Sequence, residues 1–188
     1  MAKLDANGIR QPALGEWRAD VLSAGYIADY KPFNFVDGEG VRCSLYVSGC
    51  PFNCPGCYNK AAQSFRYGKP YTKELENQIL ADLAQPYVAG ISLLGGEPFL
   101  NTNILIPLLL RIREIFGDTK NVWAWSGYTL EQLKAETDKK ELLDLCDVLV
   151  DGPFIESNFV RNLPYRGSTN QRIIDLHTGE LKIYDNFS

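Results

Sequence analysis

A unit made of a short apolar strand, a glycine-containing loop and a helix occurs twice in the middle of the chain, and few folds are compatible with it. Residues 90–94 form an apolar run that ends in Gly-Gly-Glu-Pro at 95–98, and a helical pattern of leucine and isoleucine follows to residue 115. Residues 121–125 form a second run, which Ser-Gly-Tyr and more helical sequence follow. Strands that alternate with helices in this way predict a parallel sheet with right-handed crossovers.

Two further strands extend this pattern. Residues 41–47 alternate apolar with polar side chains, which is the period of a strand, and residues 148–150 are apolar before an Asp-Gly-Pro turn. These units are too few for a closed eight-stranded barrel, so we expect an α/β fold, an open or partial (β/α) barrel, in one domain over residues 25–188. Residues 1–24 lack a firm period and predict a loosely ordered N-terminal extension.

The segments between and after these units carry weaker signals. Residues 26–40 mix aromatic residues with proline and a glycine-rich turn, so we expect a loop there. Residues 59–65 predict a short helical stretch, and Thr72 is placed to cap a helix through about residue 84. Near the C-terminus, residues 172–176 and 180–184 predict the two arms of a hairpin.

The composition excludes several classes of function. A formal net charge of -4 offers no general attraction to phosphate backbones or anionic lipid, so we expect neither nucleic acid nor a membrane as partner. The longest apolar stretch, residues 104–110, contains Pro107 and is far too short to span a bilayer. Five cysteines are an odd number, and four of them lie between Cys43 and Cys57. That distribution favours metal binding over a disulfide framework, and we expect a cytoplasmic protein.

The cysteines are the strongest chemical signal. Cys50, Cys54 and Cys57 lie within eight residues directly after the strand at 41–47, with the spacing CxxxCxxC. Cys43 falls on the apolar face of that strand and Cys146 lies beside leucines, so we expect both to be buried and not ligands. A structural zinc needs four closed ligands, and no histidine is nearby. Three soft thiolates favour a 4Fe-4S cluster with one iron free of protein ligands, while a non-catalytic zinc or electron-transfer module stays the alternative.

Several loops are predicted to meet the cysteine loop. Ligands bind at the carboxyl ends of strands in sheets of this kind. The cysteine loop, residues 95–97, residues 126–127 and Asp151 all follow predicted strands, so we expect the four to share one edge of the sheet. Without the cysteines, residues 95–96 would indicate a simple strand-to-helix turn, and Asp151 is equally well explained by a turn. The two tryptophans of residues 121–125 are expected in the core.

The CxxxCxxC group after one strand and Gly-Gly-Glu-Pro after the next together resemble the radical S-adenosylmethionine superfamily. Within this superfamily, other segments resemble the glycyl-radical activases whose protein substrate is an anaerobic ribonucleoside-triphosphate reductase. These segments are Asp37 to Cys43, Cys54 to Lys60, Trp125 to Tyr128, Val150 to Gly152 and Arg166 to Gln171. The resemblance runs from about Tyr26 to Arg172 and implies a partial barrel. The N-terminal extension is longer than we expect for a member of this family.

The resemblance also implies a cofactor, a partner and a set of site residues. Cys50, Cys54 and Cys57 would hold the 4Fe-4S cluster, and S-adenosylmethionine would bind its open iron. The residues expected to contact that cofactor are Gly56, Cys57, Tyr58, Gly95, Gly96, Glu97 and Ser126. The implied reaction is reductive cleavage of S-adenosylmethionine, after which a 5'-deoxyadenosyl radical removes hydrogen from a glycine of the reductase. An unidentified donor would supply the electron, no acid-base residue is assigned, and another glycyl-radical protein or a small molecule is the alternative substrate.

Overall fold

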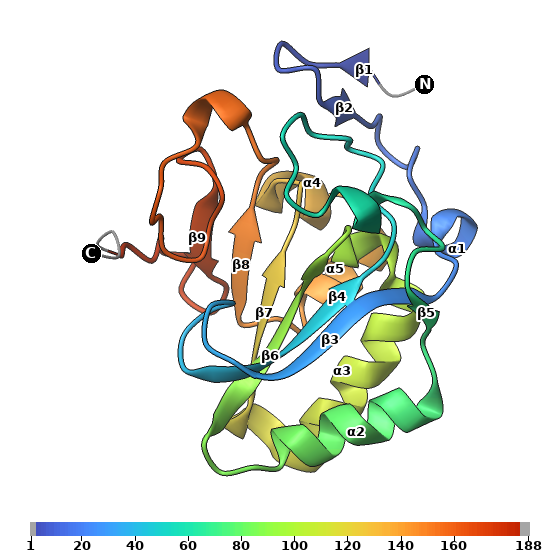
Figure 1. Cartoon of the computed structure of the whole chain (residues 1–188), viewed down its shortest axis with the longest axis vertical. Helices are drawn as coiled ribbons and strands as arrows, with labels where there is room; N and C mark the ends of the chain where they lie inside the picture. Colours follow the sequence, from blue (N-terminus) through green and yellow to red (C-terminus); the bar gives the residue numbers. More distant parts are fainter. Residues whose placement is uncertain (1–2, 185–188) are drawn as a thin grey trace.

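One seven-stranded sheet organises residues 3–184, the part of the chain that the computed structural model describes (Figure 1). Across the sheet the strands run β5 (Lys69–Pro70), β3 (Tyr26–Asn34), β4 (Val41–Val47), β6 (Val88–Gly95), β7 (Asn121–Trp125), β8 (Val148–Asp151) and β9 (Arg172–Asp175). Neighbours from β4 to β8 pair in parallel, whereas β3, β5 and β9 pair antiparallel at the two sides. The expected α/β fold with a mostly parallel sheet is confirmed.

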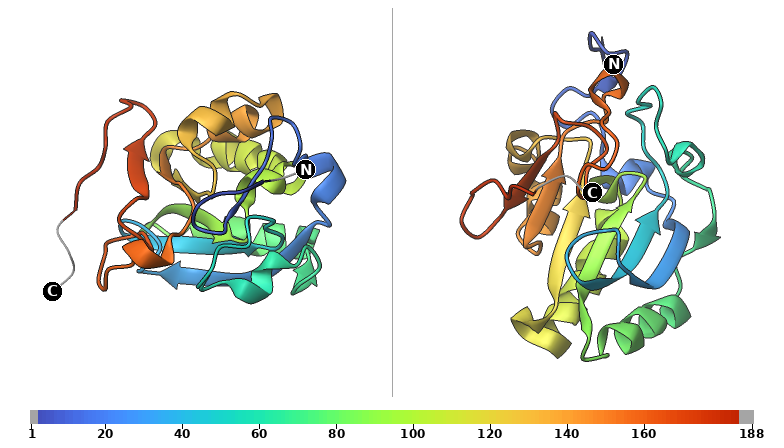
Figure 2. Two further views of the ribbon diagram at one scale, coloured as in Figure 1. Left: turned by 90° about the horizontal axis from the view of Figure 1, so that it is seen from above. Right: turned by 60° about the vertical axis from the view of Figure 1, so that its left-hand side comes forward.

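Helices connect the parallel strands. They are α2 (Lys73–Leu83) between β4 and β6, α3 (Thr102–Phe116) between β6 and β7, and α4 (Leu130–Lys134) with α5 (Thr137–Leu143) between β7 and β8. Short 3-10 helices lie at η1 (Lys60–Gln63), η2 (Pro98–Leu100), η3 (Gly117–Thr119) and η4 (Glu156–Asn158). Figure 2 shows α3 to α5 stacked on one side of the sheet. Their apolar side chains share one core cluster with those of α2 and of the sheet face toward them.

The two faces of the sheet differ in chemistry because side chains alternate along each strand. Cys43 and Leu45 of β4 face the helical core, whereas Arg42 faces the other way and is fully buried. The Arg42 guanidinium donates to Ser92 Oγ at 2.7 Å and to Asn121 Oδ1 at 2.7 Å across the neighbouring strands. Burial lowers the pKa of Arg42 to about 10. A layer of hydrogen bonds thus joins β4, β6 and β7 on the face away from the helices.

Most predicted elements are confirmed, several to the residue. The strands expected at 41–47 and 121–125 have those bounds, and β6 and β8 extend the expected runs by one to two residues. Thr72 caps α2, since its Oγ1 accepts from the Leu75 amide at 3.3 Å. The hairpin expected near the C-terminus is present only in part: β9 covers one arm, and the other meets it in a single bridge between Ile174 and Leu181.

The loop expected at residues 26–40 is wrong over its first half. Residues 26–34 form β3, which pairs antiparallel with β4. Its register shifts between Ile27 and Asp29 and again between Lys31 and Asn34. The second shift contains Pro32, which has no amide hydrogen to give, and Phe33, whose φ is 57°. These irregularities interrupt the period of the strand, so the sequence pattern indicated a loop.

The N-terminal segment is more ordered than predicted. β1 (Lys3–Leu4) pairs with β2 (Arg10–Gln11), and α1 (Ala19–Leu22) follows. Ile9 is fully buried and Trp17 is 7% exposed, both in the main core cluster. Isolated buried residues produce no period in a sequence, which is why the segment read as loosely ordered. Within the described residues, no helix is long and apolar enough to cross a membrane.

Candidate functional site

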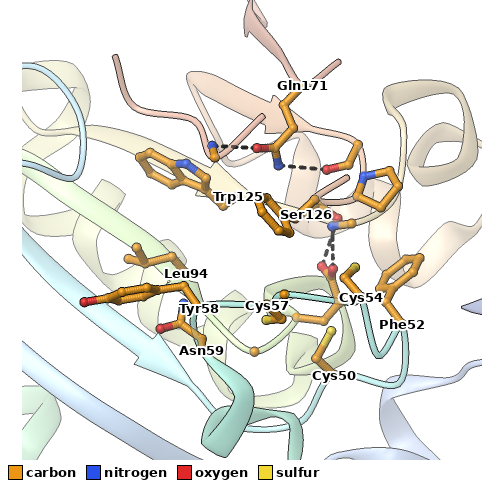
Figure 3. Close-up of a pocket in the computed structure, with 18 of the residues that line it drawn as sticks. Cys50, Phe52, Cys54, Cys57, Tyr58, Asn59, Leu94, Trp125, Ser126 and Gln171 are labelled. Atoms are coloured by element: carbon orange, nitrogen blue, oxygen red, sulfur yellow. Dashed lines mark hydrogen bonds between the residues drawn. The ribbon is translucent and has the colours of Figure 1, made fainter. Parts of the chain in front are cut away.

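A cavity of about 540 Å³ opens where the parallel strands end (Figure 3). This volume lies within the range of roughly 300–1,000 Å³ that small-molecule sites occupy. Its lining comes from the loops after β4, β6, β7 and β8 and from the segment before β9: Cys50, Cys54, Gly56, Cys57, Tyr58, Gly95, Gly96, Glu97, Trp125, Ser126, Gly127, Gly152, Phe154, Glu156, Phe159, Gly167 and Gln171, among others. The predicted meeting of these loops at one edge is confirmed.

The cysteine loop is shaped by contacts at its two ends. Gly49 begins it with a φ of 99°, and a Cβ there would lie 2.0 Å from the ring of Phe65. The amides of Gly49 and Cys50 donate to the carbonyls of Ala62 and Gln63, at 2.7 and 3.0 Å. The chain after the cysteines therefore returns through η1 and closes against the start of the loop. Any side chain at position 49 would collide with Phe65, which belongs to this returning segment.

The three thiols of the loop lie together on one side of the cavity (Figure 3). They are free, and burial raises the pKa of Cys50 well above its ordinary value and that of Cys54 to about 11. Metal binding requires thiolates, so loading such a site would release protons. In the described part of the chain, no group of three or more histidine, cysteine, aspartate or glutamate side chains is arranged to hold a metal ion. A single ion needs its ligands to converge on one point, whereas each thiolate of an iron-sulfur cluster binds a different iron, and thiols are the side chains that such clusters use.

The other two cysteines are placed as predicted. Cys43 is fully buried on β4, toward the helices, and Cys146 is 5% exposed in the turn after α5. The Cys146 thiol donates to the Leu142 carbonyl at 3.3 Å, and burial raises the pKa of both thiols. Neither lines the cavity. Both behave as small apolar residues of the core.

Gly95 and Gly96 bring the exit of β6 against the cysteine loop. The Gly96 amide donates to the Val47 carbonyl at 2.7 Å, and the Glu97 amide donates to the Gly49 carbonyl at 2.8 Å. A Cβ on Gly96 would lie 2.6 Å from that Gly49 oxygen, and Gly95 has a φ of 103°. The glycines therefore permit direct backbone contact between two loops, which is more than a strand-to-helix turn requires.

The Glu97 carboxylate connects the exits of β6 and β7. It is 1% exposed and accepts hydrogen bonds from the Phe99 amide at 3.1 Å, Ser126 Oγ at 2.9 Å and the Gly127 amide at 2.8 Å. Burial raises its pKa to about 7, against the opposing effect of these donors. Glu97 thus borders the cavity, but its oxygen atoms face donors of the protein.

The remaining predicted residues lie at different depths. Ser126 is buried in the wall, where its Oγ also accepts from the Tyr128 amide at 3.0 Å. Gly56 has a φ of 69°, and a Cβ there would lie 2.7 Å from the Glu156 carboxylate. Tyr58 is fully exposed beside the cavity. Asp151 does not line the cavity; it accepts from the Leu130 amide at 2.7 Å and pairs with Arg172.

Two residues of the cavity wall were not predicted to be there. Trp125 lines the cavity, stacks on Trp123 with ring centroids 5.7 Å apart and donates to the Tyr165 carbonyl at 2.7 Å. Gln171 accepts from the Gly167 amide at 2.8 Å and donates to the Gly152 carbonyl at 2.9 Å, across the cavity from the cysteines (Figure 3). The position of Trp125 at the carboxyl end of its strand was the available signal. Gln171 belongs to a segment that resembles the activases, but its contact with Gly152, 19 positions earlier in the chain, leaves no periodic signal.

Known proteins match this chain over most of its length. The family model described as a 4Fe-4S single cluster domain matches residues 36–174, which include the cysteine loop and each loop of the cavity wall. The site therefore belongs to the class of single-cluster 4Fe-4S domains. Three curated relatives carry the name anaerobic ribonucleoside-triphosphate reductase-activating protein.

The relative from Pasteurella multocida is 43% identical over 148 residues, which are 77% of this chain and 93% of that protein. The relative from Escherichia coli K12 is 44% identical over 147 residues, 76% of this chain and 93% of that protein. The relative from Enterobacteria phage T4 is 34% identical over 144 residues, 76% of this chain and 88% of that protein. The chain belongs to the family of anaerobic ribonucleoside-triphosphate reductase-activating proteins, which confirms the resemblance to these activases.

Proposed function

We propose that this protein activates an anaerobic ribonucleoside-triphosphate reductase by cleaving S-adenosylmethionine reductively at a 4Fe-4S cluster held by Cys50, Cys54 and Cys57. One observation carries the proposal: the three thiols and the loops at 95–97 and 126–127 line one cavity. The names of the relatives support the choice of the reductase as the protein substrate. The sheet from β4 to β8 is then the open part of a radical S-adenosylmethionine barrel, whose uncovered side admits a loop of the partner.

A 4Fe-4S cluster held by Cys50, Cys54 and Cys57 would supply one electron for the cleavage of S-adenosylmethionine into methionine and a 5'-deoxyadenosyl radical, and that radical would take a hydrogen atom from a glycine Cα of the reductase. The chain itself binds and orients the cofactor. Gly95 and Gly96 let the exit of β6 contact the cysteine loop directly, and Gly56 lets that loop pass close to Glu156, so these glycines fix the wall against which a ligand would lie. Leu94 and Trp125 give the cavity apolar walls that exclude water and other hydrogen donors. No proton transfer is required, and no acid-base residue is assigned.

The electron donor is a separate reductant, and the reaction takes place in the reducing cytoplasm. The five cysteines are all free thiols in the structure, which suits that compartment. Under these conditions the cluster can be assembled on the three cysteines of the loop without competition from a disulfide.

The test is anaerobic incubation of the reconstituted protein with its reductase, S-adenosylmethionine and dithionite. We expect a glycine-centred doublet in the electron paramagnetic resonance spectrum of the reductase. Cys57→Ala should abolish the doublet, and Cys43→Ala, which removes a buried thiol outside the cavity, should retain it. A protein with a full cluster that cleaves S-adenosylmethionine without forming the doublet would point to another substrate. Stoichiometric zinc without iron after anaerobic purification would refute the proposal.

A further inference from the structure

The N-terminal segment packs against the cysteine loop at Phe52. We call residues 9–17 the N-terminal brace. The Arg10 amide in β2 donates to the Phe52 carbonyl at 2.9 Å, and Phe52 lies between two of the loop cysteines, Cys50 and Cys54. In Figure 1 the β1–β2 hairpin lies directly above this loop, at the same end of the molecule. The brace therefore contacts the loop at its centre, and none of residues 9–17 lines the cavity.

Trp17 of the brace holds the Phe52 ring in an aromatic cluster. Its ring centroid lies 5.0 Å from that of Phe52 in an edge-to-face arrangement, and Tyr128 contacts Phe52 in the same way at 4.9 Å. Trp17 and Tyr128 are themselves 6.2 Å apart. Phe52 is 1% exposed, and these two rings are among the neighbours that cover it. Edge-to-face pairs of this kind add stabilisation beyond the apolar area that they bury.

Phe52 itself lines the cavity, and its ring touches Gly127, another residue of the wall. A Cβ on Gly127 would lie 2.6 Å from two carbon atoms of that ring. Gly127 donates to the Glu97 carboxylate, and Glu97 in turn bonds to Gly49 at the start of the cysteine loop. A shift of Phe52 would therefore move the wall and the cysteines together.

Trp17 is itself fixed by a buried lysine. Lys139 is fully buried in α5 and donates from Nζ to the Trp17 carbonyl at 2.9 Å and to Glu136 at 2.6 Å. Its ammonium also lies 5.4 Å from the centre of the Tyr128 ring. A buried charge is costly unless it is paired and hydrogen-bonded, so the Trp17 carbonyl is part of what keeps Lys139 satisfied. The brace is thus attached to the core and does not merely lie on the surface.

We propose that the N-terminal brace positions the cluster loop: Trp17, acting through Phe52, holds Cys50 and Cys54 in the arrangement that a cluster requires before the cluster binds. The role of these cysteines as ligands rests on the proposed function, whereas the order of the loop does not. A loop held in place in advance loses less conformational entropy when its ligand binds. Trp17 is a positioning residue and touches no reacting atom.

The test compares three variants of the full-length chain. Trp17→Ala removes the ring over Phe52, and Trp17→Phe keeps an aromatic ring at the same place. Leu14→Ala is the matched control, because Leu14 belongs to the same brace but is 74% exposed. Each variant is prepared free of metal under reducing conditions, and alkylation by N-ethylmaleimide is followed at each cysteine by peptide mass spectrometry.

We expect Trp17→Ala to raise the alkylation rates of Cys50 and Cys54 about tenfold, because the loop opens more often once Phe52 is uncovered. Cys43 and Cys146 should stay protected, since they lie in the helical core. Trp17→Phe should restore most of the protection, and Leu14→Ala should match the unsubstituted protein. After reconstitution, Trp17→Ala should lose iron to a chelator faster than the control.

Two results would overturn the inference. One is an unchanged alkylation rate at Cys50 and Cys54 in Trp17→Ala. The other is a rise at Cys43, Cys50, Cys54 and Cys146 in step, since Trp17 would then contribute only to global stability. These readouts are independent of turnover. If Trp17→Ala exposes the loop cysteines as expected but the unsubstituted protein never forms a glycyl radical, the proposed function is wrong and the role of the brace is supported. If the glycyl radical forms but Trp17→Ala leaves the alkylation rates unchanged, only the role of the brace is wrong.

Discussion

Replacing Glu97 with glutamine tests which force sets the charge of the carboxylate between β6 and β7. Burial disfavours the charged form, whereas three donors, from Phe99, Ser126 and Gly127, favour it. In the structure burial dominates, and the pKa of Glu97 rises from 4.5 to about 7. A raised pKa in the folded state means that folding favours the protonated form. The corresponding stability is fully present below pH 4.5 and is lost as the pH rises through 7.

The size of this effect follows from the two pKa values. One pKa unit corresponds to about 1.4 kcal/mol, so the difference between 4.5 and about 7 contributes about 3 kcal/mol in full, of which about 2–3 kcal/mol is lost between pH 5 and pH 8. Glutamine does not titrate. Its amide nitrogen also cannot accept a hydrogen bond, so one buried donor loses its partner at a cost of about 1–3 kcal/mol at any pH.

The assay is urea denaturation of the metal-free protein at pH 5, 6, 7 and 8. We expect the stability advantage of the unsubstituted protein over Glu97→Gln to shrink by about 2–3 kcal/mol across this range. Glu131→Gln is the control, because pairing with Arg172 lowers the pKa of Glu131 to about 2 and its titration is complete below pH 5. An advantage that stays constant or grows with pH would show that the three donors outweigh burial and that the reasoning is wrong.

Three other substitutions test separate parts of the structure. Gly96→Ala sets a Cβ 2.6 Å from the Gly49 carbonyl oxygen, so we expect the free energy of unfolding in urea to fall by about 2–3 kcal/mol and the protein to hold less iron after reconstitution. A normal iron content would contradict the importance of this backbone contact. Arg42→Lys keeps the positive charge but loses the planar guanidinium that bonds to Ser92 and Asn121, so the free energy of unfolding should fall by about 2–4 kcal/mol in the same assay. A fall of less than about 0.5 kcal/mol would mean that this hydrogen-bond network is dispensable. Cys43→Ala should cost about 1–2 kcal/mol without loss of iron, while Cys57→Ala should lose the iron.

Local patterns account for what the sequence predicted well. The strands at 41–47 and 121–125 were found to the residue because each alternates or concentrates apolar side chains over a length that a strand can use. Loops at the carboxyl ends of parallel strands must meet at one edge, so the topology alone brought the cysteine loop to residues 95–97 and 126–127. The burial of Cys43 followed from the same alternation.

Contacts between distant residues account for what the sequence did not reveal. β3 was missed because Pro32 and a register shift break its period, although the strand is held by its pairing with β4. The burial of Trp17 depends on Phe52 and on Lys139, which lies 122 positions further along the chain. Gln171 is held in the cavity wall by its hydrogen bond to the Gly152 carbonyl, 19 positions earlier, and such a pairing leaves no periodic pattern.

The direct contact between the Gly96 and Gly49 backbones gives the cavity one inflexible side. No side chain there can be shortened or rotated to adjust the spacing, because main-chain atoms define it. Other parts of the wall are built from side chains, such as those of Leu94 and Phe159. For protein engineering this division is useful: substitutions at Leu94 or Phe159 are expected to change what the cavity admits, while the backbone contact between Gly96 and Gly49 does not depend on either side chain.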